Sequence, residues 1–493
     1  MSRLNQNTLN QLAASVIRPK YDRNKIKPGI VHLGIGAFHR AHQAVYTEAV
    51  INQFGGDWGI IGCSLRSASV RDQLVPQDNY YTVIERSNAG EKIQLMGVIK
   101  DTLVGPENPL QLIEIMSDEG IKIISMTITE KGYCHDPATG NLNFEHPDIQ
   151  HDLQNLQRPK SAIGYLVATL QMRFSGHQSA VTLLSCDNLP NNGEVLEKVV
   201  LQFAEKISLA LKDWVEKNVC FPSTMIDRIV PATTEEDKLE IERIIGLRDE
   251  GLVICEPFSQ WVIENKFATQ RPAWEKVGAL IVDDVRIFEK IKLRLLNGAH
   301  SLMAYTGYLA GFEYIYQVMQ QPAFVNMVTS YMAEDAGRSI QAPAGFDIEA
   351  YKQQLRDRFS NRALKHRTWQ IAMDGSQKLP QRILETLREN LDQGKSISIL
   401  CLAIAAWIRY VSGTDEKGEL IDVRDPLAAQ LRDLCSQHQG NTSELVHAIF
   451  NVTAVFGDDL KDAKGAIQET ILWLDRFYSQ GTLNTIGQYF NKP

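Results

Sequence analysis

The sequence lacks the features of a nucleic-acid-binding, secreted or membrane-spanning protein. Its 51 Lys and Arg residues are outnumbered by 59 Asp and Glu residues, for a formal net charge of -8, and there is no basic stripe. The longest apolar run, 397–408, is too short and too interrupted to cross a bilayer. Residues 1–22 lack the apolar core of a signal peptide. We therefore expect a cytoplasmic protein, a monomer or small homo-oligomer, with neither nucleic acid nor a membrane as a partner.

The sequence also lacks paired cysteines and metal-ligand spacings. Its seven cysteines are scattered, and no two are close enough in sequence to form a CxxC site. An odd number of scattered cysteines is typical of reduced thiols in a reducing compartment. We predict neither a disulfide framework nor a metal centre.

A short buried strand near the N-terminus is followed by a glycine turn and a helix. Ile30, Val31 and Leu33 form the predicted strand, and 41–52 has helical spacing. The turn residues predicted to approach a cofactor pyrophosphate are Gly34, Gly36, Ala37, Phe38 and Arg40. A strand, a tight turn and a helix N-terminus are the context of a dinucleotide fingerprint. His39 stands where the third glycine would be, so the motif alone is a weak signal.

Two further predicted strands end in polar residues suited to cofactor contact. The strand 58–65 is followed by Arg66, where an NAD enzyme often carries Asp or Glu to hold the ribose 2′-hydroxyl. An arginine there could equally accept a 2′-phosphate, so these residues leave NAD and NADP both open. The strand 121–128 is followed by Thr129 and Glu130, and polar residues at the carboxyl end of a parallel strand usually face the ligand crevice.

Residues 284–309 form a long amphipathic stretch whose apolar residues recur at three- and four-residue steps, which predicts a buried helix. Relative to Lys292, at about 100° per residue, Glu289 lies at about 60° and His300 at about 80°. Asn297 lies at about 140° by the same rule. A lysine on such a helix is usually a solvated charge, and a lone histidine is usually a core residue. Burying four polar side chains without partners would cost several kcal/mol, so they are predicted to line a polar cavity.

The order of the elements predicts an α/β fold with two domains. Strands and helices alternate up to about residue 283, and the rest of the chain has helical patterns. We predict a Rossmann-type dinucleotide-binding domain over 1–283 and an all-helical substrate-binding domain over 284–493, with the site between them. The segments 80–84 and 93–99 are predicted to form a hairpin inserted in the sheet.

At 292–300 the chain resembles the polyol-specific long-chain dehydrogenases, the mannitol dehydrogenase family. The resemblance extends, in the family's order, through 34–40, 127–130, 185–188, 226–231 and 374–378. Within the family the likeness is to the members that interconvert D-mannonate and D-fructuronate. The resemblance implies an NAD-dependent dehydrogenase of hexuronate catabolism that acts on a sugar acid without a catalytic zinc.

The resemblance also implies roles for individual residues. Lys292 resembles the general acid/base, and Glu289 resembles a carboxylate that passes the lysine's proton towards solvent. Asn188 and Asn297 resemble the pair of amides that holds the reacting oxygen, although an asparagine after a strand is also a common turn residue. The implied substrate contacts are His300, Lys378 and Asp227.

One departure from the family bears on the substrate. Mannitol-oxidising members are expected to carry Arg eight positions before Lys378, where this chain has Gln370. That favours a substrate with a different terminal group, such as a uronate, whose buried carboxylate needs a cation. Arg367 is the candidate cation; the alternative interpretation is that Arg367 is a solvated surface charge. Mannitol or another polyol remains the alternative substrate. A non-catalytic nucleotide sensor is an alternative function, but a sensor would not need the complete set of catalytic residues that this chain carries.

Overall fold

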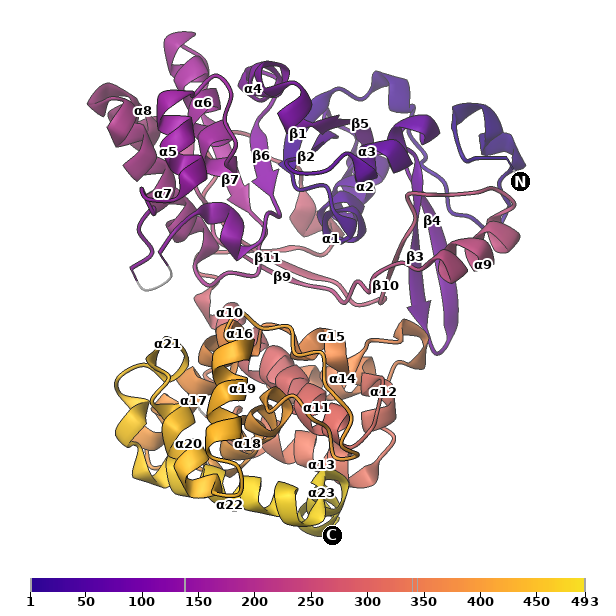
Figure 1. The fold of residues 1–493 in the computed structure, drawn as a ribbon. Coiled ribbons are helices and arrows are strands. Elements are labelled where there is room, and N and C mark those ends of the chain that lie inside the picture. The colour runs from indigo at the N-terminus through magenta and orange to yellow at the C-terminus, as the bar shows by residue number, and fades with distance from the viewer. Residues whose placement is uncertain (1, 137–138, 339, 344, 492–493) are drawn as a thin grey trace. The chain divides into compact units, whose positions relative to one another are not determined.

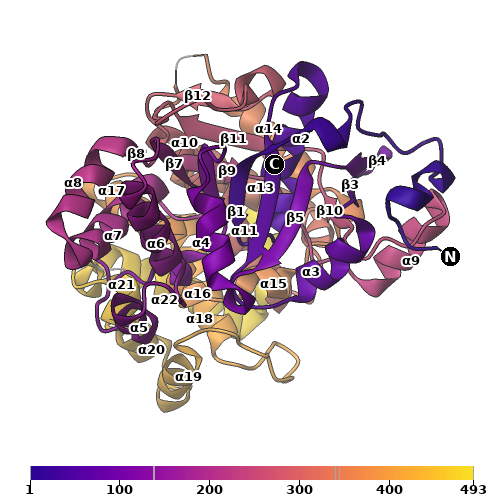
Figure 2. The same cartoon turned by 90° about the horizontal axis from the view of Figure 1, so that it is seen from above.

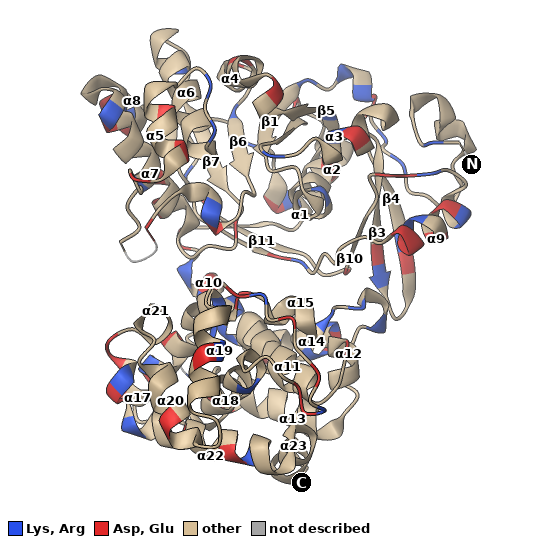
Figure 3. Ribbon diagram, viewed as in Figure 1, with Lys and Arg blue, Asp and Glu red and all other residues tan. Residues whose placement is uncertain are grey.

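The computed structural model describes residues 2–136, 139–338, 340–343 and 345–491 (Figure 1). The chain divides into two compact units, Met1–Arg286 and Ile287–Pro493. Strands and helices alternate in the first unit, and the described part of the second is helical, so the predicted fold class is confirmed. Across the described residues, no helix has both the length and the apolar character needed to cross a membrane. Acidic and basic residues are interspersed over the elements of both units (Figure 3).

The first unit is built on a six-stranded parallel sheet with the order β5-β2-β1-β6-β7-β8. Counting only the strands of this sheet, the order is 3-2-1-4-5-6, which is that of a Rossmann fold. The strands are β1 (Pro28–Leu33), β2 (Gly59–Ser64), β5 (Ile99–Val104), β6 (Ile123–Met126), β7 (Val181–Ser185) and β8 (Val219–Cys220). The strand order reverses between β1 and β6, and ligands bind at the carboxyl ends of strands at such a point.

Alternating strand residues bury both faces of this sheet. Val31 and Ile124 point into one apolar core with α4 (Pro109–Ser117) and α6 (Ala162–Ser175), which lie side by side (Figure 2). Ile30 and Ile123, one residue earlier in each strand, point into a second core with α2. The helices of this unit are α1 (Ala37–Ala41), α2 (Gln43–Phe54), α3 (Ser69–Leu74), α4 (Pro109–Ser117), α5 (Pro147–Gln154), α6 (Ala162–Ser175), α7 (Asn192–Ile207), α8 (Leu209–Asn218) and α9 (Glu235–Ile245).

The predicted hairpin is present, but it does not lie in the main sheet. Strands β3 (Tyr81–Ser87) and β4 (Gly90–Met96) pair antiparallel, and β3 also pairs with β10 (Val253–Cys255) to make a separate sheet. The third sheet is formed by β9 (Thr224–Asp227), β11 (Gln260–Glu264) and β12 (Leu280–Val282). The prediction that the hairpin is inserted in the main sheet was wrong. Its partner strand β10 lies far away in sequence, and local sequence patterns do not indicate which distant strands pair.

The second unit is a bundle in which α11 packs against α15 and α18, and α18 packs against α22. Its described helices are α10 (Arg286–Ile291), α11 (Gly298–Leu309), α12 (Ile315–Val318), α13 (Pro322–Ser330), α14 (Ile348–Phe359), α15 (Thr368–Ala372), α16 (Gly375–Leu379), α17 (Glu385–Asp392), α18 (Ser398–Val411), α19 (Ala428–Gln437), α20 (Thr442–Phe450), α21 (Thr453–Phe456), α22 (Lys464–Gln480) and α23 (Thr482–Phe490). Three π-helical turns, Lys292–Asn297, Tyr331–Asp335 and Pro380–Leu384, interrupt them.

The predicted helix over 284–309 is therefore not a continuous α-helix. The π-turn Lys292–Asn297 joins α10 to α11, and the Gly298 N–H donates to the Leu293 carbonyl five residues earlier. Because hydrogen bonds in a π-turn link residues five apart, Lys292 and Asn297 are turned towards one face. The α-helical rule, which set them about 140° apart, was wrong here. Such turns are frequent at functional sites.

Candidate functional site

The turn after β1 has the backbone shape that a dinucleotide requires. Gly34 has a φ of +92°, and a Cβ there would lie 2.1 Å from the Thr127 carbonyl oxygen, so only glycine fits. Gly36 is exposed and precedes α1 without a side-chain cap. A Cβ at Gly36 would meet nothing nearer than 3.8 Å, so the backbone is open on that side. The turn residues fit a pyrophosphate at the start of α1.

The loop after β6 is held by a carboxylate that the sequence analysis did not single out. Asp187 accepts hydrogen bonds from the N–H groups of Ile128 (3.1 Å) and Thr129 (2.8 Å) and from the Tyr133 hydroxyl (2.8 Å). Thr129 has a φ of +65° and a ψ of 162°, a backbone conformation that is uncommon outside glycine. Asp187 therefore fixes the loop that carries Thr129 and Glu130 beside the point where the strand order reverses. Its place directly after a buried strand was the available signal.

The two arginines predicted to contact the cofactor have different surroundings. Arg40 is buried, and its guanidinium donates to the carbonyl oxygens of Gly251 and Gly36 and lies over the Tyr81 ring. Burial lowers the pKa of Arg40. This geometry gives Arg40 a structural role, and its phosphate contact stays a prediction. Arg66 is exposed just beyond the carboxyl end of β2, and Ala37 and Phe38 form the first turn of α1, each half-buried.

His39, which occupies the position of the third fingerprint glycine, is part of a buried stack. Its ring lies 3.4 Å from the His32 ring, centroid to centroid, at an interplanar angle of 15°. The His32 ring nitrogens contact the hydroxyls of Ser125 (2.8 Å) and Thr127 (2.9 Å). Burial lowers the pKa of His39 to about 3 and that of His32 well below its ordinary value. Both rings are therefore neutral at physiological pH.

We expect the stacked histidines to make the first unit sensitive to acid. His39 takes up a proton near pH 6.5 in the unfolded chain but only near pH 3 in the folded one. Between these values the unfolded state binds more protons, so stability should fall by about 1.4 kcal/mol per pH unit as the pH drops. Urea midpoints at pH 7 and pH 5 should differ less in His39→Phe than in the wild type. The exposed histidine in His177→Asn is the control, and an unchanged difference in His39→Phe would contradict the assignment.

The second unit buries the polar residues of its π-turn. Lys292, Asn297 and His300 have 8%, 7% and 7% of their surface exposed, and Glu289 in α10 has 8%. Among the described residues, neither Asn297 Nδ2 nor His300 Nε2 has a hydrogen-bond partner. Leaving a buried polar group unsatisfied costs about 1–3 kcal/mol. Two such groups three residues apart are therefore suited to a ligand that supplies the missing partners.

Cationic side chains act electrostatically on His300 and its neighbour His366. The two rings lie 5.3 Å apart at 85°, and His366 Nδ1 also has no hydrogen-bond partner among the described residues. Burial lowers the pKa of His300 well below its ordinary value, and His366, Arg382 and Arg358 lower it further. Burial and then Lys378 lower the pKa of His366 to about 4. Two neutral imidazoles thus lie within a region of positive charge.

The remaining predicted substrate residues of the second unit are more exposed to solvent than Lys292, Asn297 and His300. The Arg367 side chain is 57% exposed and lies 3.6 Å from Glu313, as a solvated surface charge would, and Gln370 is exposed in α15. Lys378 is half-buried in α16 and donates to the carbonyl oxygens of Ile371 (3.3 Å) and Met373 (2.5 Å). Sequence reasoning missed Arg358 and Arg382, because each comes from a helix or turn outside the recognised motifs.

Two residues with predicted substrate roles lie in the first unit. Asn188 is exposed three positions after the end of β7. Asp227 is buried at the end of β9, where it pairs with Gln260 of β11. Within the described residues, no group of three His, Cys, Asp or Glu side chains is placed to hold a metal ion.

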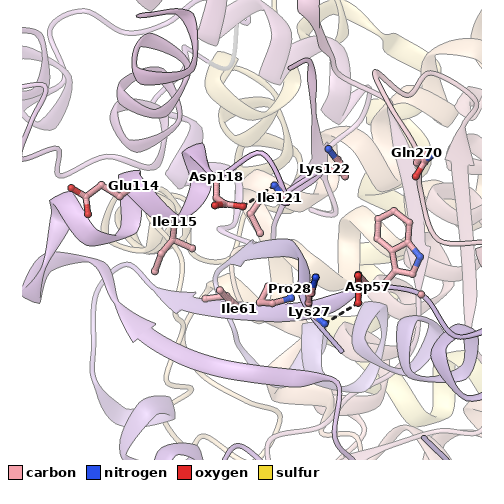
Figure 4. A pocket seen from close by; sticks show the side chains of 13 residues that line it. Lys27, Pro28, Asp57, Ile61, Glu114, Ile115, Asp118, Ile121, Lys122 and Gln270 are labelled. Atoms are coloured by element: carbon pink, nitrogen blue, oxygen red, sulfur yellow. Dashed lines mark hydrogen bonds between the residues drawn. The ribbon is translucent and has the colours of Figure 1, made fainter. Parts of the chain in front are cut away.

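A hollow of about 940 Å³ lies at the opposite edge of the Rossmann sheet (Figure 4). Its lining includes Pro28, at the start of β1, and Trp58, just before β2. Ile121 and Lys122, before β6, also line it. Because these are the amino ends of the strands, the hollow is separate from the glycine turn at the carboxyl ends.

Family models match both units of the chain. Residues 28–276 match the Mannitol dehydrogenase Rossmann domain, and residues 284–477 match the Mannitol dehydrogenase C-terminal domain. The chain belongs to the mannitol dehydrogenase family. It is an oxidoreductase of that family, and the predicted resemblance is confirmed.

Relatives in the mannitol dehydrogenase family cover nearly the whole chain. The chain is 46% identical to "Uncharacterized oxidoreductase YeiQ" and 44% identical to D-mannonate oxidoreductase, both of Escherichia coli (strain K12), with 91% and 90% of this chain and 92% of each relative covered. The structure of Pseudomonas fluorescens mannitol 2-dehydrogenase in ternary complex with NAD and D-mannitol is 36% identical. It superposes with a TM-score of 0.92 and covers 100% of both chains.

Proposed function

We propose that this protein is an NAD-dependent oxidoreductase that interconverts D-mannonate and D-fructuronate. The observation that carries the proposal is the cluster around His300, where buried nitrogens without a partner among the described residues lie in the positive field of arginine and lysine side chains. A uronate brings a carboxylate, and a carboxylate in a buried site needs positive charge and hydrogen-bond donors. The 44% identity to D-mannonate oxidoreductase supports the same substrate.

In this proposal Lys292 is the general acid/base. The glycine turn of Gly34 and Gly36 would hold NAD, which would supply the hydride acceptor. Lys292 would take the proton of the substrate hydroxyl as the carbonyl forms. Asn297 Nδ2, which has no partner among the described residues, would donate to the oxygen as it gains negative charge. The family resemblance assigns the same task to Asn188, and it assigns proton transfer towards solvent to Glu289.

The choice of NAD over NADP rests on the family. The solved mannitol 2-dehydrogenase holds NAD, and the first unit of this chain is a Rossmann domain of the same family with an open glycine turn. Arg66, at the end of β2, is the residue through which an NADP preference would act. We further propose that the protein works in the cytoplasm, as a monomer or small homo-oligomer.

Mannitol is the second candidate substrate. It is supported by the solved relative that carries D-mannitol and that matches the chain over its full length. Mannitol has no charged group, so it brings no carboxylate for the cations around His300 to meet. That difference makes the two candidates separable by kinetics.

We expect Arg358→Ala to weaken the reduction of D-fructuronate much more than that of D-fructose. Arg358 is 7% exposed and close enough to His300 to lower its pKa, whereas Arg367 is exposed and serves as the matched control. Losing a buried partner of a carboxylate costs about 2–5 kcal/mol, or about 30-fold or more in kcat/KM. NADH oxidation by folded protein, followed at 25 °C with each ketose, measures the ratio.

Three possible results distinguish the hypotheses about which arginine meets the substrate carboxylate. A selective loss with fructuronate in Arg358→Ala, partly restored in Arg358→Lys, supports the proposal. Equal losses with both ketoses would mean that Arg358 has only a structural role. A selective loss in Arg367→Ala instead would restore Arg367 as the cation that meets the carboxylate.

A further inference from the structure

The π-turn that carries Lys292 and Asn297 has a specific hydrogen-bond partner outside its own helix. In an α-helix the Gly298 N–H would donate to the Arg294 carbonyl, but here it donates to Leu293. The Tyr331 hydroxyl donates to the Arg294 carbonyl instead, at 3.0 Å. Tyr331 is fully buried. A tyrosine from another helix thus supplies a donor at the carbonyl whose α-helical bond is lost.

Gly298 is shaped for this contact. A Cβ at Gly298 would lie 1.9 Å from the Tyr331 hydroxyl oxygen and 3.0 Å from the Arg382 carbonyl oxygen. Gly298 is helical and needs no unusual φ, so glycine is required for space and not for conformation. The glycine in the motif at 292–300 therefore lets the tyrosine reach the turn.

Tyr331 is itself rigidly anchored. It begins a π-turn in which the Ala336 N–H donates to the Tyr331 carbonyl at 2.9 Å. Asp335, at the end of that turn, accepts from the N–H groups of Ile399 (2.8 Å) and Leu400 (3.1 Å) at the start of α18. The segment that carries Tyr331 is thus tied to the start of α18, most of whose residues are buried.

We propose that Tyr331 is a positioning residue that holds the π-turn so that Lys292 and Asn297 share one face. The proposal rests on the proposed acid/base role of Lys292. Without the hydroxyl, Gly298 N–H can return to the Arg294 carbonyl, and the turn relaxes towards an α-helix. That change rotates Lys292 away from Asn297 and separates the two groups that act on the reacting oxygen.

The test is Tyr331→Phe, which removes only the hydroxyl. Misplacing a catalytic group by about 1 Å can cost about 10²-fold, so we expect kcat to fall at least about 10-fold, with the KM for NADH changed less than about twofold. The control is Tyr410→Phe, which removes a buried hydroxyl without a hydrogen-bond partner among the described residues and should leave kcat unchanged. A Tyr331→Phe protein with lower thermal stability but wild-type kcat would overturn the proposal.

A double-mutant cycle distinguishes a role of Tyr331 in positioning Lys292 from a general loss of rigidity in the helical unit. If Tyr331 acts through Lys292, then Tyr331→Phe in the Lys292→Ala background should cost less than about threefold, although it costs about 10-fold in the wild type. Equal penalties in both backgrounds would overturn the proposal. If the wild type reduces fructose better than fructuronate, the proposed substrate fails, and the same cycle is run with fructose because both ketoses need the same proton donor.

Discussion

Replacing Lys292 with alanine is expected to lower turnover by about 10²- to 10⁴-fold, the usual contribution of a general acid/base. The side chain is buried in the π-turn that also carries Asn297, whose Nδ2 has no partner among the described residues. Because none of the predicted cofactor-binding residues is changed, the Kd for NADH should hardly change. Steady-state turnover and NADH fluorescence titration measure the two quantities. Added primary amines should partly restore turnover.

Lys290 offers a matched control for this experiment. It precedes Lys292 by two residues in the same helical stretch, but its side chain is 40% exposed and its Nζ lies 3.0 Å from Glu389. Exposed ion pairs contribute about 0–1 kcal/mol, so Lys290→Ala should keep its turnover. A Lys292→Ala protein that retains near-wild-type turnover would remove Lys292 from the mechanism.

Asn297→Ala should lower turnover by about 10²-fold, as the loss of one donor to a developing oxyanion does. The Nδ2 group makes no hydrogen bond to the described protein, so its removal costs no such bond and should change thermal stability little. Turnover per folded molecule and the melting temperature are measured on the same preparation.

Asn390→Ala is the control for a purely structural asparagine, and it should lose stability but keep turnover. Asn390 is fully buried, and its Nδ2 donates to the carbonyl oxygens of Asp335 (2.8 Å) and Ser396 (2.7 Å). Its loss leaves two buried carbonyl groups without this donor, so stability should fall by about 1–3 kcal/mol while turnover per folded molecule persists. If Asn297→Ala behaves like Asn390→Ala, Asn297 is a structural residue.

The features that are local in sequence were predictable. The strand Ile30–Leu33, its glycine turn and the following helix have a hydrophobic pattern and turn residues that leave few alternatives, and β1 and α2 lie there. The same holds for the strands that precede Arg66 and Thr129. Polar residues at strand ends were expected at the ligand edge, and the 3-2-1-4-5-6 order gives that edge its switch point.

The features that depend on long-range packing were not predictable. A π-turn shifts the helical phase by about one residue, which the apolar pattern around Lys292 tolerates without a visible break. The ring of His39, a residue of the turn, stacks on the ring of His32, a residue of the strand. The sequence pattern of neither segment predicts this contact. Arg358 and Arg382, from separate helical segments, both lower the pKa of His300, whereas Arg367, close to Lys378 in sequence, lies exposed.

The most direct test of the account follows the hydride. Wild-type enzyme is incubated with D-fructuronate, D-fructose and NADH carrying deuterium at the transferable position of the nicotinamide, and the products are identified by NMR and mass spectrometry. We predict D-mannonate with one deuterium on the carbon that was the ketone, formed at least about 30-fold faster than any hexitol, as the loss of one buried carboxylate contact would require. Deuterated mannitol as the main product, with fructuronate unchanged, would contradict the proposed function.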